Sequence, residues 1–501
     1  MGSVLEYLER AAWESPERTA LADQDRTFTY GEAYRLSRQV GAFVARLEGG
    51  CRPVGVWARH DAVTPLLCWG AAWGGCFYVP LDPDLPPGKL RKILDDCALD
   101  LILTARPKDA LPPGTDFSGR VICLEEAVDE GRGEDCPPTG REDDAPLYMV
   151  YTSGSTGTPK GVLKSHGAVR HFIEDFAAAF PFSPAEVIGS QTPFFFDASA
   201  KDLYLTLYLG ARLEVVDAGL FYAPVQLVEY LNRRRVTTIC WVPSALSILT
   251  QLNTFSEIKP QYLRNVFFVG EVFPMKQLNR WRAALPQVRY VNLYGSTELA
   301  GVCCWYEVEG DFADTDRLPI GRPLGRSRVF LRAEGEIVTR PGVMGEICVA
   351  SPALALCYYN DPEKTRSVFR REVLPSGEEA RVLYTGDLAQ YTPEGLLEFA
   401  ARKDHQFKHM GRRIEAGEIE AAAAALDQVA RCCCLYDGQR GKIVLFCQLA
   451  SGCEATGREL RRALRDRLAD YMVPNKVTIL PQLPLNPNGK IDRPALRASL
   501  E

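Results

Sequence analysis

The sequence predicts an α/β protein with a large N-terminal domain of parallel-rich sheets sandwiched by helices, a β subdomain, and a small α+β C-terminal domain. Two features of the sequence predict this class. Short apolar runs alternate with helical patterns along most of the chain, which is typical of largely parallel sheets. Short β runs and turns then dominate residues 319–400, and a mixed pattern follows residue 403.

The strand-like runs of the first region are apolar and bounded by turn residues. They lie at residues 53–58, 101–104, 121–124, 147–152, 238–242, 266–269 and 289–293. Helical patterns separate many of them, as at residues 30–47 and 227–234. The most apolar stretch, residues 66–81, is too short to span a membrane and contains three glycines. We therefore expect a buried helix followed by a strand there.

The β subdomain of residues 319–400 is indicated by short runs such as 345–349 and 396–400. A boundary is expected near residue 403, which separates a core of residues 1–402 from a C-terminal domain of residues 403–501. In this domain the pattern predicts, in order, a helix at 415–426, strand pairs within 429–449, a helix at 458–468, and a Pro-, Asn- and Gly-rich tail at 484–493 that ends in a loop and not in a helix.

Composition excludes some classes of protein. The chain has 501 residues, with 58 Lys and Arg against 64 Asp and Glu, so its net charge is −6. This balance argues against a nucleic-acid binder with a broad basic face. The sixteen cysteines show no C-x-x-C spacing, and a chain of this length can fold on its apolar core, so we expect reduced, mostly buried thiols. We find no secretory signal and no membrane span, and expect a cytoplasmic protein.

Residues 152–161, with the sequence TSGSTGTPKG, carry the clearest chemical signal. They directly follow a strand-like run. Their glycines permit the close approach of an anion, and their hydroxyls and Lys160 can donate to phosphate oxygens. The chain has no G-x-x-x-x-G-K-[ST] motif, and this segment is not a G-x-S-x-G nucleophile elbow. We therefore expect a phosphate-binding loop here.

Residues 151–162 resemble the phosphate loop of adenylate-forming enzymes, the superfamily of acyl-CoA synthetases, luciferases and nonribosomal peptide synthetase adenylation domains. Further motifs of the superfamily lie in its order over essentially the whole chain. They are FYVPLD at 77–82, FDAS at 196–199, NLYGSTE at 292–298, GEI at 345–347, YTGD at 384–387, GRRIEAGEIE at 411–420, YMVP at 471–474 and NGKIDR at 488–493. Within the superfamily, the chain is most similar to amino-acid-activating domains and stand-alone D-alanine–carrier-protein ligases.

The resemblance implies ATP and Mg²⁺ as cofactors. Thr297 would contact the α-phosphate, and Glu298 would ligate Mg²⁺, a cation that prefers oxygen ligands. The β,γ-phosphates would lie against Thr152, Ser153, Gly154, Ser155, Thr156, Gly157 and Lys160.

The same resemblance places the rest of the nucleotide. Tyr294 would stack on adenine, and Asp387 would accept the ribose hydroxyls with help from Arg402. The full set for this part of the nucleotide is Gly270, Glu271, Asn292, Tyr294, Gly295, Asp387 and Arg402. Each of three residues, taken alone, also has a structural interpretation. Tyr294 could be a core residue, Asp387 a turn residue, and Glu298 a solvated surface acid.

The resemblance also implies that the C-terminal domain is mobile. Lys490, in an Asn-Gly-Lys turn, would bridge the substrate carboxylate and the α-phosphate. After the adenylate forms, the domain would swing about the hinge residue Asp404 and exchange Lys490 for the Gly411 loop, with Lys408 beside the path of a thiol. The alternative for Lys490 is a solvated lysine of the tail. Met410 stands where related enzymes frequently have a basic residue.

Asp197 is the first indication of the substrate. In amino-acid-activating relatives this residue pairs with the α-ammonium group, by a charge-assisted hydrogen bond. The alternative is a helix N-cap. The implied substrate pocket is mostly apolar and consists of Asp197, Ala198, Lys201, Trp241, Phe267, Val269, Leu293, Gly301 and Val302.

Lys201 is the one cation of that pocket. It lies four residues after Asp197, so in a helix the two share a face, whereas Asp202 would point elsewhere. A lysine among apolar residues needs an anionic partner. One hypothesis is that the substrate's side chain supplies it, which would make the substrate an acidic amino acid such as glutamate or aspartate. The alternative is that Lys201 reaches solvent and the pocket takes a neutral side chain.

The sequence thus predicts an enzyme that activates an amino acid as aminoacyl-AMP and transfers it to the phosphopantetheine thiol of a carrier protein. The predicted catalytic residues are Lys160, Thr297, Glu298 and Lys490. Eight residues follow Arg493, so we expect the carrier to be a separate protein, and we expect neither a nucleic acid nor a membrane as a partner. The alternatives are an acyl- or aryl-CoA ligase on the same scaffold, an amine as the acceptor, and a non-catalytic nucleotide-binding protein.

Overall fold

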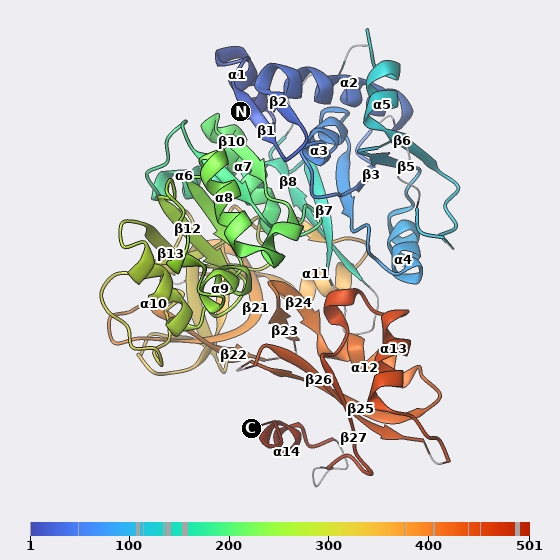
Figure 1. The fold of residues 1–501 in the computed structure, drawn as a ribbon, viewed down its shortest axis with the longest axis vertical. Coiled ribbons are helices and arrows are strands. Elements are labelled where there is room, and N and C mark those ends of the chain that lie inside the picture. Colours follow the sequence, from blue (N-terminus) through green and yellow to red (C-terminus); the bar gives the residue numbers. More distant parts are fainter. Residues whose placement is uncertain are drawn as a thin grey trace.

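The chain folds into two large mixed sheets, a six-stranded antiparallel sheet and two small sheets, with helices packed around them (Figure 1). The computed structural model describes residues 2–48, 50–106, 111–113, 115–133, 136, 142–152, 159–374, 376–403, 406–438, 440–450, 452–485 and 491–500. The predicted site residues that lie outside the described residues are Ser153, Gly154, Ser155, Thr156, Gly157, Asp404 and Lys490.

The largest sheet has nine strands, with parallel pairing in its centre and antiparallel pairing at both ends. In spatial order they are β15 (Arg322–Pro323), β14 (Cys304–Glu307), β13 (Arg289–Tyr294), β12 (Asn265–Val269), β11 (Thr238–Trp241), β9 (Val187–Ser190), β10 (Arg212–Val215), β1 (Thr19–Ala22) and β2 (Thr27–Thr29).

A second large sheet has seven strands and the same mixture of pairing. In spatial order they are β19 (Cys357–Tyr358), β8 (Lys160–Ser165), β7 (Pro146–Thr152), β4 (Phe77–Leu81), β3 (Pro53–Trp57), β5 (Leu101–Thr104) and β6 (Arg120–Cys123). The α/β class predicted from the alternating pattern is thereby confirmed.

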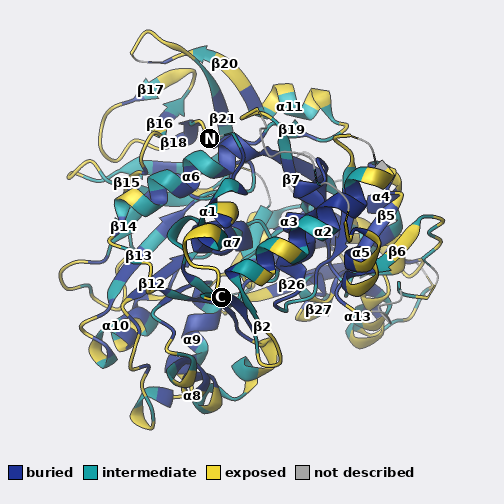
Figure 2. Ribbon diagram, turned by 90° about the horizontal axis from the view of Figure 1, so that it is seen from above, coloured by how far each residue is buried: buried dark blue, intermediate teal, exposed yellow. Residues whose placement is uncertain are grey.

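The helices of this region cover and separate the two large sheets (Figures 1 and 2). They are α1 (Glu6–Glu14), α2 (Tyr30–Glu48), α3 (Thr64–Trp73), α4 (Pro87–Cys97), α5 (Leu124–Glu130), α6 (His166–Ala179), α7 (Ala198–Leu209), α8 (Pro224–Arg234), α9 (Pro243–Gln251), α10 (Met275–Ala284) and α11 (Pro362–Val368). Short 3₁₀ turns lie at Ala218–Tyr222, Thr254–Ser256 and Asp470–Met472.

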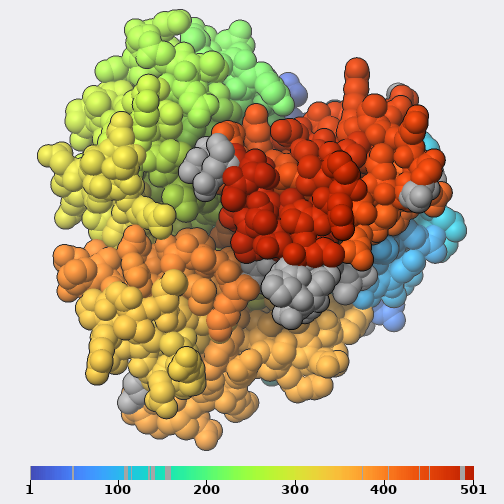
Figure 3. Space-filling model, turned by 90° about the horizontal axis from the view of Figure 1, so that it is seen from below, coloured from blue at the N-terminus to red at the C-terminus, as the bar shows by residue number. Residues whose placement is uncertain are grey.

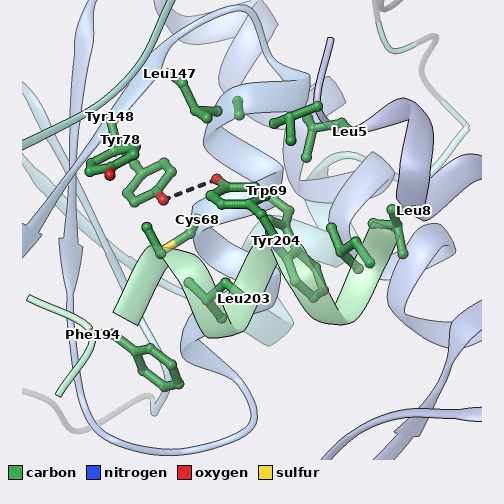
Figure 4. Close-up of a cluster of buried hydrophobic side chains, with 14 of the residues drawn as sticks. Leu5, Leu8, Cys68, Trp69, Tyr78, Leu147, Tyr148, Phe194, Leu203 and Tyr204 are labelled. Atoms are coloured by element: carbon green, nitrogen blue, oxygen red, sulfur yellow. Dashed lines mark hydrogen bonds between the residues drawn. The ribbon is translucent and has the colours of Figure 1, made fainter. Parts of the chain in front are cut away.

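The apolar stretch at residues 66–81 forms a buried helix and strand, as predicted. Every residue of α3 is buried, which explains why the helix is apolar on all sides. Gly70 permits close packing of α3 on α2, because a Cβ at this position would lie 2.4 Å from Cγ1 of Val40. On another side of α3, Leu203 and Tyr204 of α7 pack near Trp69 (Figure 4).

Helix α7 connects the core to the substrate pocket predicted from the sequence. The Tyr204 hydroxyl lies 3.0 Å from the Tyr78 hydroxyl of β4, and the Tyr78 ring stacks on Tyr148 of β7 (Figure 4). Tyr148 in turn donates to Asp197, the residue before α7. The position of Asp197 is therefore fixed by the packing of α7 against the seven-stranded sheet.

The β runs predicted in residues 319–400 form a six-stranded antiparallel sheet. Its strands are β17 (Glu336–Val338), β16 (Arg328–Ala333), β18 (Gly345–Ala350), β21 (Glu379–Tyr391) and β20 (Phe369–Val373) in spatial order, with β22 (Leu397–Arg402) on the other half of β21. Glycine 386 of β21 has φ +74°, and a break in register lies beside it, where the strand carries Asp387.

The C-terminal part contains two small sheets and three helices, and it packs against the underside of the remaining chain (Figure 3). Its elements are β23 (Gln406–His409), β24 (Arg412–Glu415), α12 (Ala416–Ala424), β25 (Val429–Asp437), β26 (Lys442–Leu449), α13 (Gly457–Arg465), β27 (Lys476–Ile479) and α14 (Arg493–Ala498). The boundary near residue 403 stays a prediction.

One expectation for this part was wrong. The tail was expected to end in a loop, but α14 begins at Arg493. Asp492 accepts a hydrogen bond from the Ala495 N–H at 3.0 Å, Pro494 lies in the first turn, and Leu496 is buried against β25 and β26. A good cap and one buried leucine are enough to order this short helix.

The cysteines follow the prediction. No disulfide joins any of them, all sixteen belong to the described residues, and most are buried. Neighbouring cysteines of β25 face opposite sides of the sheet, because Cys433 packs with Leu496 of α14 whereas Cys434 packs with α12 and α13. In the part of the chain that the structure describes, we find no helix long and apolar enough to cross a membrane.

Candidate active site

A cavity of about 660 Å³ lies where β7, the start of α7, the ends of β12 and β13, and β21 meet the β23–β24 hairpin. The predicted site residues that line it are Thr152, Asp197, Ala198, Lys201, Val269, Gly270, Gly295, Thr297, Gly301, Val302, Asp387 and Arg402. The two large sheets and the C-terminal part therefore all contribute to one site.

Other predicted residues lie behind this lining. Trp241, Phe267 and Leu293 are buried in the apolar core, and the Trp241 indole donates to the Gly189 carbonyl at 2.8 Å. Asn292 donates from its side-chain amide to the Pro319 carbonyl at 2.8 Å. These residues shape the cavity from the second layer, and their predicted contacts with substrate or nucleotide stay predictions.

Asp387 has two partners at the cavity wall. It forms an ion pair with Arg402 of the neighbouring strand β22 and accepts a hydrogen bond from the Tyr294 hydroxyl at 2.5 Å. Burial, together with the Asp387 charge, raises the pKa of Tyr294 well above its ordinary value. The Tyr294 ring packs in an apolar cluster, as expected for a core residue. Its hydroxyl nevertheless donates a hydrogen bond to Asp387 at the cavity wall.

Glu298 is buried and carries a charge. Arg413 of β24 donates to both carboxylate oxygens, at 2.7 and 3.0 Å, and the Tyr358 hydroxyl donates at 2.6 Å. Burial alone would raise the pKa of this carboxyl, but Arg413 and the Tyr358 hydroxyl outweigh it, and the pKa falls to about 2. The alternative of a solvated surface acid is wrong, because Glu298 is 4% exposed.

The β23–β24 hairpin enters the cavity with its turn residues Met410 and Gly411 first. Both have positive φ, +52° and +75°, as a two-residue hairpin turn requires. The Gly411 N–H donates to Glu271 at 2.8 Å, and a Cβ at Gly411 would lie 2.2 Å from Cγ1 of Val242. Only glycine therefore fits where the turn meets the large domain.

Beyond the turn, Arg412 of β24 contacts Phe196 across the same interface and Tyr471 within the C-terminal part. The Arg412 guanidinium lies 4.5 Å from the Phe196 ring centre and 4.0 Å from that of Tyr471. Lys408 lines the cavity, and burial lowers its pKa. The sequence resemblance placed the Gly411 loop in the site for the second half-reaction. Gly411 lines the cavity in this structure, and the assignment of this arrangement to one half-reaction stays a prediction.

The Lys490 segment lies outside the described residues, but its flanks are described. Leu485 and Ile491 form a β-bridge with each other. Ile491 packs in the cluster that joins Phe446 of β26 to Leu496 of α14.

The phosphate loop is described only at its ends. Thr152 lines the cavity at the end of β7, and Lys160 begins β8. The Lys160 ammonium lies 3.9 Å from a carboxylate oxygen of Glu415. Burial lowers the pKa of Lys160, and Glu415 offsets part of that effect.

Asp197 occupies the N-cap position of α7, as the alternative held, but its carboxylate accepts no capping hydrogen bond from the helix backbone. Its carboxylate instead forms an ion pair with Lys164 of β8 and accepts a hydrogen bond from the Tyr148 hydroxyl at 2.8 Å. Lys164 is completely buried and also donates to the Leu299 carbonyl at 2.7 Å. Sequence reasoning missed this lysine, and the signal that could have found it is weak: Lys164 directly follows the apolar residues Val162 and Leu163.

Lys201 also differs from expectation. We expected Asp202 to point elsewhere, but Lys201 folds back and forms a buried ion pair with Asp202. Burial lowers the pKa of Lys201, but Asp202 outweighs it and the net direction is upward. Because its charge is balanced within the protein, Lys201 gives no reason to expect an acidic substrate.

The residues also fit a single Mg²⁺ bound with a phosphate. Among the described residues no group of three or more His, Cys, Asp or Glu side chains could hold a metal ion by itself. Glu298 offers a charged carboxylate, the donor type that Mg²⁺ prefers, and phosphate oxygens would complete the shell. Here Arg413 occupies both oxygens of Glu298, so Mg²⁺ and Arg413 would use the carboxylate in turn.

Comparison with known proteins shows which family this chain belongs to. The family model of the AMP-binding enzymes matches residues 8–359, and the model of the AMP-binding enzyme C-terminal domain matches residues 418–490. The L-proline--[L-prolyl-carrier protein] ligase of Pseudomonas fluorescens is 31% identical, over 97% of each chain. Tyrocidine synthase 1 of Brevibacillus parabrevis is 30% identical over 99% of this chain, which spans only 45% of that relative's length.

A solved structure shows the same fold. The holo form of PA1221, a nonribosomal peptide synthetase protein with adenylation and carrier domains bound to a vinylsulfonamide inhibitor, superposes with a TM-score of 0.86 at 22% identity. The superposition covers 99% of this chain and 84% of that one. The family models, the full-length relative and the shared fold together identify this chain as a member of the AMP-binding enzymes, the adenylate-forming ligases.

Proposed function

We propose that this protein condenses the carboxylate of an amino acid, or of a close analogue, with ATP, and then passes the acyl group to the phosphopantetheine thiol of a separate carrier protein. The observation that carries the proposal is the β23–β24 hairpin in the cavity, with Gly411 on Glu271 and Arg413 on Glu298. The similarity to an amino acid–carrier-protein ligase over nearly its full length supports the same reaction.

In the first half-reaction, a carboxylate oxygen of the substrate would attack the α-phosphorus and pyrophosphate would leave. Asp387 and Arg402 would position the ribose, and the loop with Lys160 would hold the β,γ-phosphates. Glu298 would hold Mg²⁺, which offsets phosphate charge when it is bound. Lys490 would approach the carboxylate and the α-phosphate while the hairpin is withdrawn.

In the second half-reaction, the thiol sulfur would attack the acyl carbon, the bond to the AMP oxygen would break, and the thiol proton would pass to solvent. Arg413 would take the position at Glu298 that the cation leaves. Arg413 donates from one nitrogen, Nη1, to both oxygens of Glu298, and its positive charge would repel a cation bound to the same carboxylate. The two arrangements would therefore disfavour each other. The exchange would couple pyrophosphate release to entry of the hairpin.

The test is acid-dependent exchange of pyrophosphate into ATP, run with L- and D-amino acids, their 2-hydroxy analogues, fatty acids and aryl acids. Exchange with an amino acid or a hydroxy analogue supports the proposal. Exchange only with fatty or aryl acids would contradict the proposal and support the alternative function of an acyl- or aryl-CoA ligase. No exchange with any acid rejects catalysis by this site.

A second assay identifies the acceptor. The activated acid is offered CoA, phosphopantetheine, and a holo carrier domain from a peptide synthetase, and the thioester is detected by mass spectrometry. Loading of the carrier domain or of phosphopantetheine in preference to CoA is expected. A preference for CoA would contradict the carrier assignment and leave the adenylation step standing.

A further inference from the structure

The ion pair between Asp197 and Lys164 lies at the cavity wall, where Asp197 would meet the group next to the substrate's carboxylate if the sequence resemblance holds. Asp197 lines the cavity, whereas Lys164 reaches it from β8, on the side away from the cavity. Lys164 and Tyr148 both contact Oδ1 of Asp197. The carboxylate is thus held from behind, and the contacts described leave Oδ2 for a ligand.

Among the described residues, Asp197 is the one carboxylate within ion-pair distance of Lys164. Glu298 is the other acid whose charge acts on it, but Arg413 occupies Glu298 in this arrangement. When the hairpin is withdrawn, Mg²⁺ would take the place of Arg413, so Glu298 has another cation in both half-reactions. Asp197 is therefore the counter-ion of Lys164 throughout the cycle.

The remaining lining offers no other anion for a cationic substrate. Of the described residues that line the cavity, the carboxylates are Asp197 and Asp387, and Asp387 is paired with Arg402. Asp202, which lies behind the lining, is paired with Lys201. An ammonium group in this cavity would be an additional positive charge within a buried, already balanced set of ion pairs.

We propose that Lys164 is a fixed internal counter-ion of Asp197, and that the cavity selects a carboxylic acid whose neighbouring carbon carries a hydroxyl group and no ammonium group. This inference rests on the proposed adenylation activity and narrows its substrate to 2-hydroxy acids. A hydroxyl can donate to Oδ2 of Asp197 without adding charge. A 2-oxo group has no hydrogen to donate, so it would meet the carboxylate unfavourably.

The side chain of such an acid would lie in the apolar part of the cavity. Phe172, Ala245, Ile248, Val269 and Val302 line this part. They offer a surface for an aliphatic or aromatic group.

The experiment compares acids that differ only in this one group. Pyrophosphate exchange is measured for L-leucine against 2-hydroxy-4-methylpentanoate, L-valine against 2-hydroxy-3-methylbutanoate, and L-phenylalanine against 3-phenyllactate. In the best pair, kcat/KM for the hydroxy acid should exceed that for the amino acid by about 100-fold, because the amino acid brings an unbalanced buried charge. Both enantiomers of each hydroxy acid are included.

The matched variants are Lys164→Leu and Arg332→Leu, each of which removes the cation of one largely buried ion pair. Lys164→Leu leaves Asp197 without a cation. The ratio of kcat/KM for the hydroxy acid to kcat/KM for the amino acid should therefore fall by about 100-fold. Arg332→Leu should leave the ratio unchanged, because neither Arg332 nor its partner Glu372 lines the cavity. Thermal unfolding reports whether each variant is folded.

Three results would overturn the inference: a wild-type preference for the amino acids, exchange only with acids that carry neither group, or an unchanged ratio in folded Lys164→Leu. If that variant does not fold, the wild-type ratio decides alone. Absence of exchange with every acid would instead reject the proposed adenylation activity on which the inference rests.

Discussion

Replacing Arg413 by methionine should separate the two half-reactions. Arg413 makes two hydrogen bonds to the carboxylate of Glu298, at 2.7 and 3.0 Å, and both side chains are largely buried. Breaking one partner of such a pair costs about 3 kcal/mol or more. That cost falls on the arrangement in which the hairpin lies in the cavity, because only this arrangement contains the pair.

A loss of about 3 kcal/mol lowers the population of the hairpin-in arrangement by roughly 100-fold relative to the alternative. Transfer from a preformed acyl-adenylate to phosphopantetheine should slow by about that factor. Pyrophosphate exchange should stay within about threefold of wild type, since Arg413 would leave Glu298 during adenylation.

The assay is a pair of measurements on each protein: pyrophosphate exchange, and single-turnover transfer from the supplied adenylate. Arg431→Met is the matched control, because Arg431 is an exposed arginine of the same domain, and both rates should match wild type. Equal losses in both half-reactions of Arg413→Met, or no loss in either, would refute the reasoning that Glu298 serves Mg²⁺ and Arg413 in turn.

Three further predictions test other parts of the site. Asp387→Asn should raise the KM for ATP about tenfold and leave the KM for the acid unchanged, because the ribose would lose a charged hydrogen-bond acceptor. A KM for ATP equal to that of the wild type would show that Asp387 does not bind the ribose. Lys490→Ala should abolish exchange yet leave transfer from a supplied adenylate nearly intact, and loss of both would contradict a role confined to adenylation. Glu298 has a pKa of about 2 in the folded protein against 4.5 ordinarily, so its stabilising contribution is present above about pH 4.5 and is lost as the pH falls towards 2. The difference in unfolding free energy between wild type and Glu298→Gln should therefore shrink over that interval in urea titrations, and a constant difference would argue against the low pKa.

Local sequence patterns were sufficient for the fold class and for several of its elements. The run at residues 289–293 became β13 (Arg289–Tyr294), and the pattern at 30–47 became α2 (Tyr30–Glu48), because burial of one face imposes a short-range period on the sequence. Element ends were less certain, as α14 shows. Its stability depends on the contact of Leu496 with β25 and β26, which no local pattern reveals.

The sequence by itself determined which residue types gather at the site, because the motifs at 152–161, 292–298 and 384–387 each carry their chemistry within a few neighbouring residues. Many of them line one cavity, although their individual roles stay predictions.

Only the tertiary structure decided which charges meet. Lys164 and Asp197 are 33 residues apart, and Glu298 and Arg413 are 115 apart. Both pairs form because separate elements pack together: β8 against the start of α7, and the β23–β24 hairpin against the large domain. Which charges pair depends on the distance between them in space and on the burial that excludes water. Both quantities depend on how the elements pack, so they cannot be deduced from the separation of the residues along the chain.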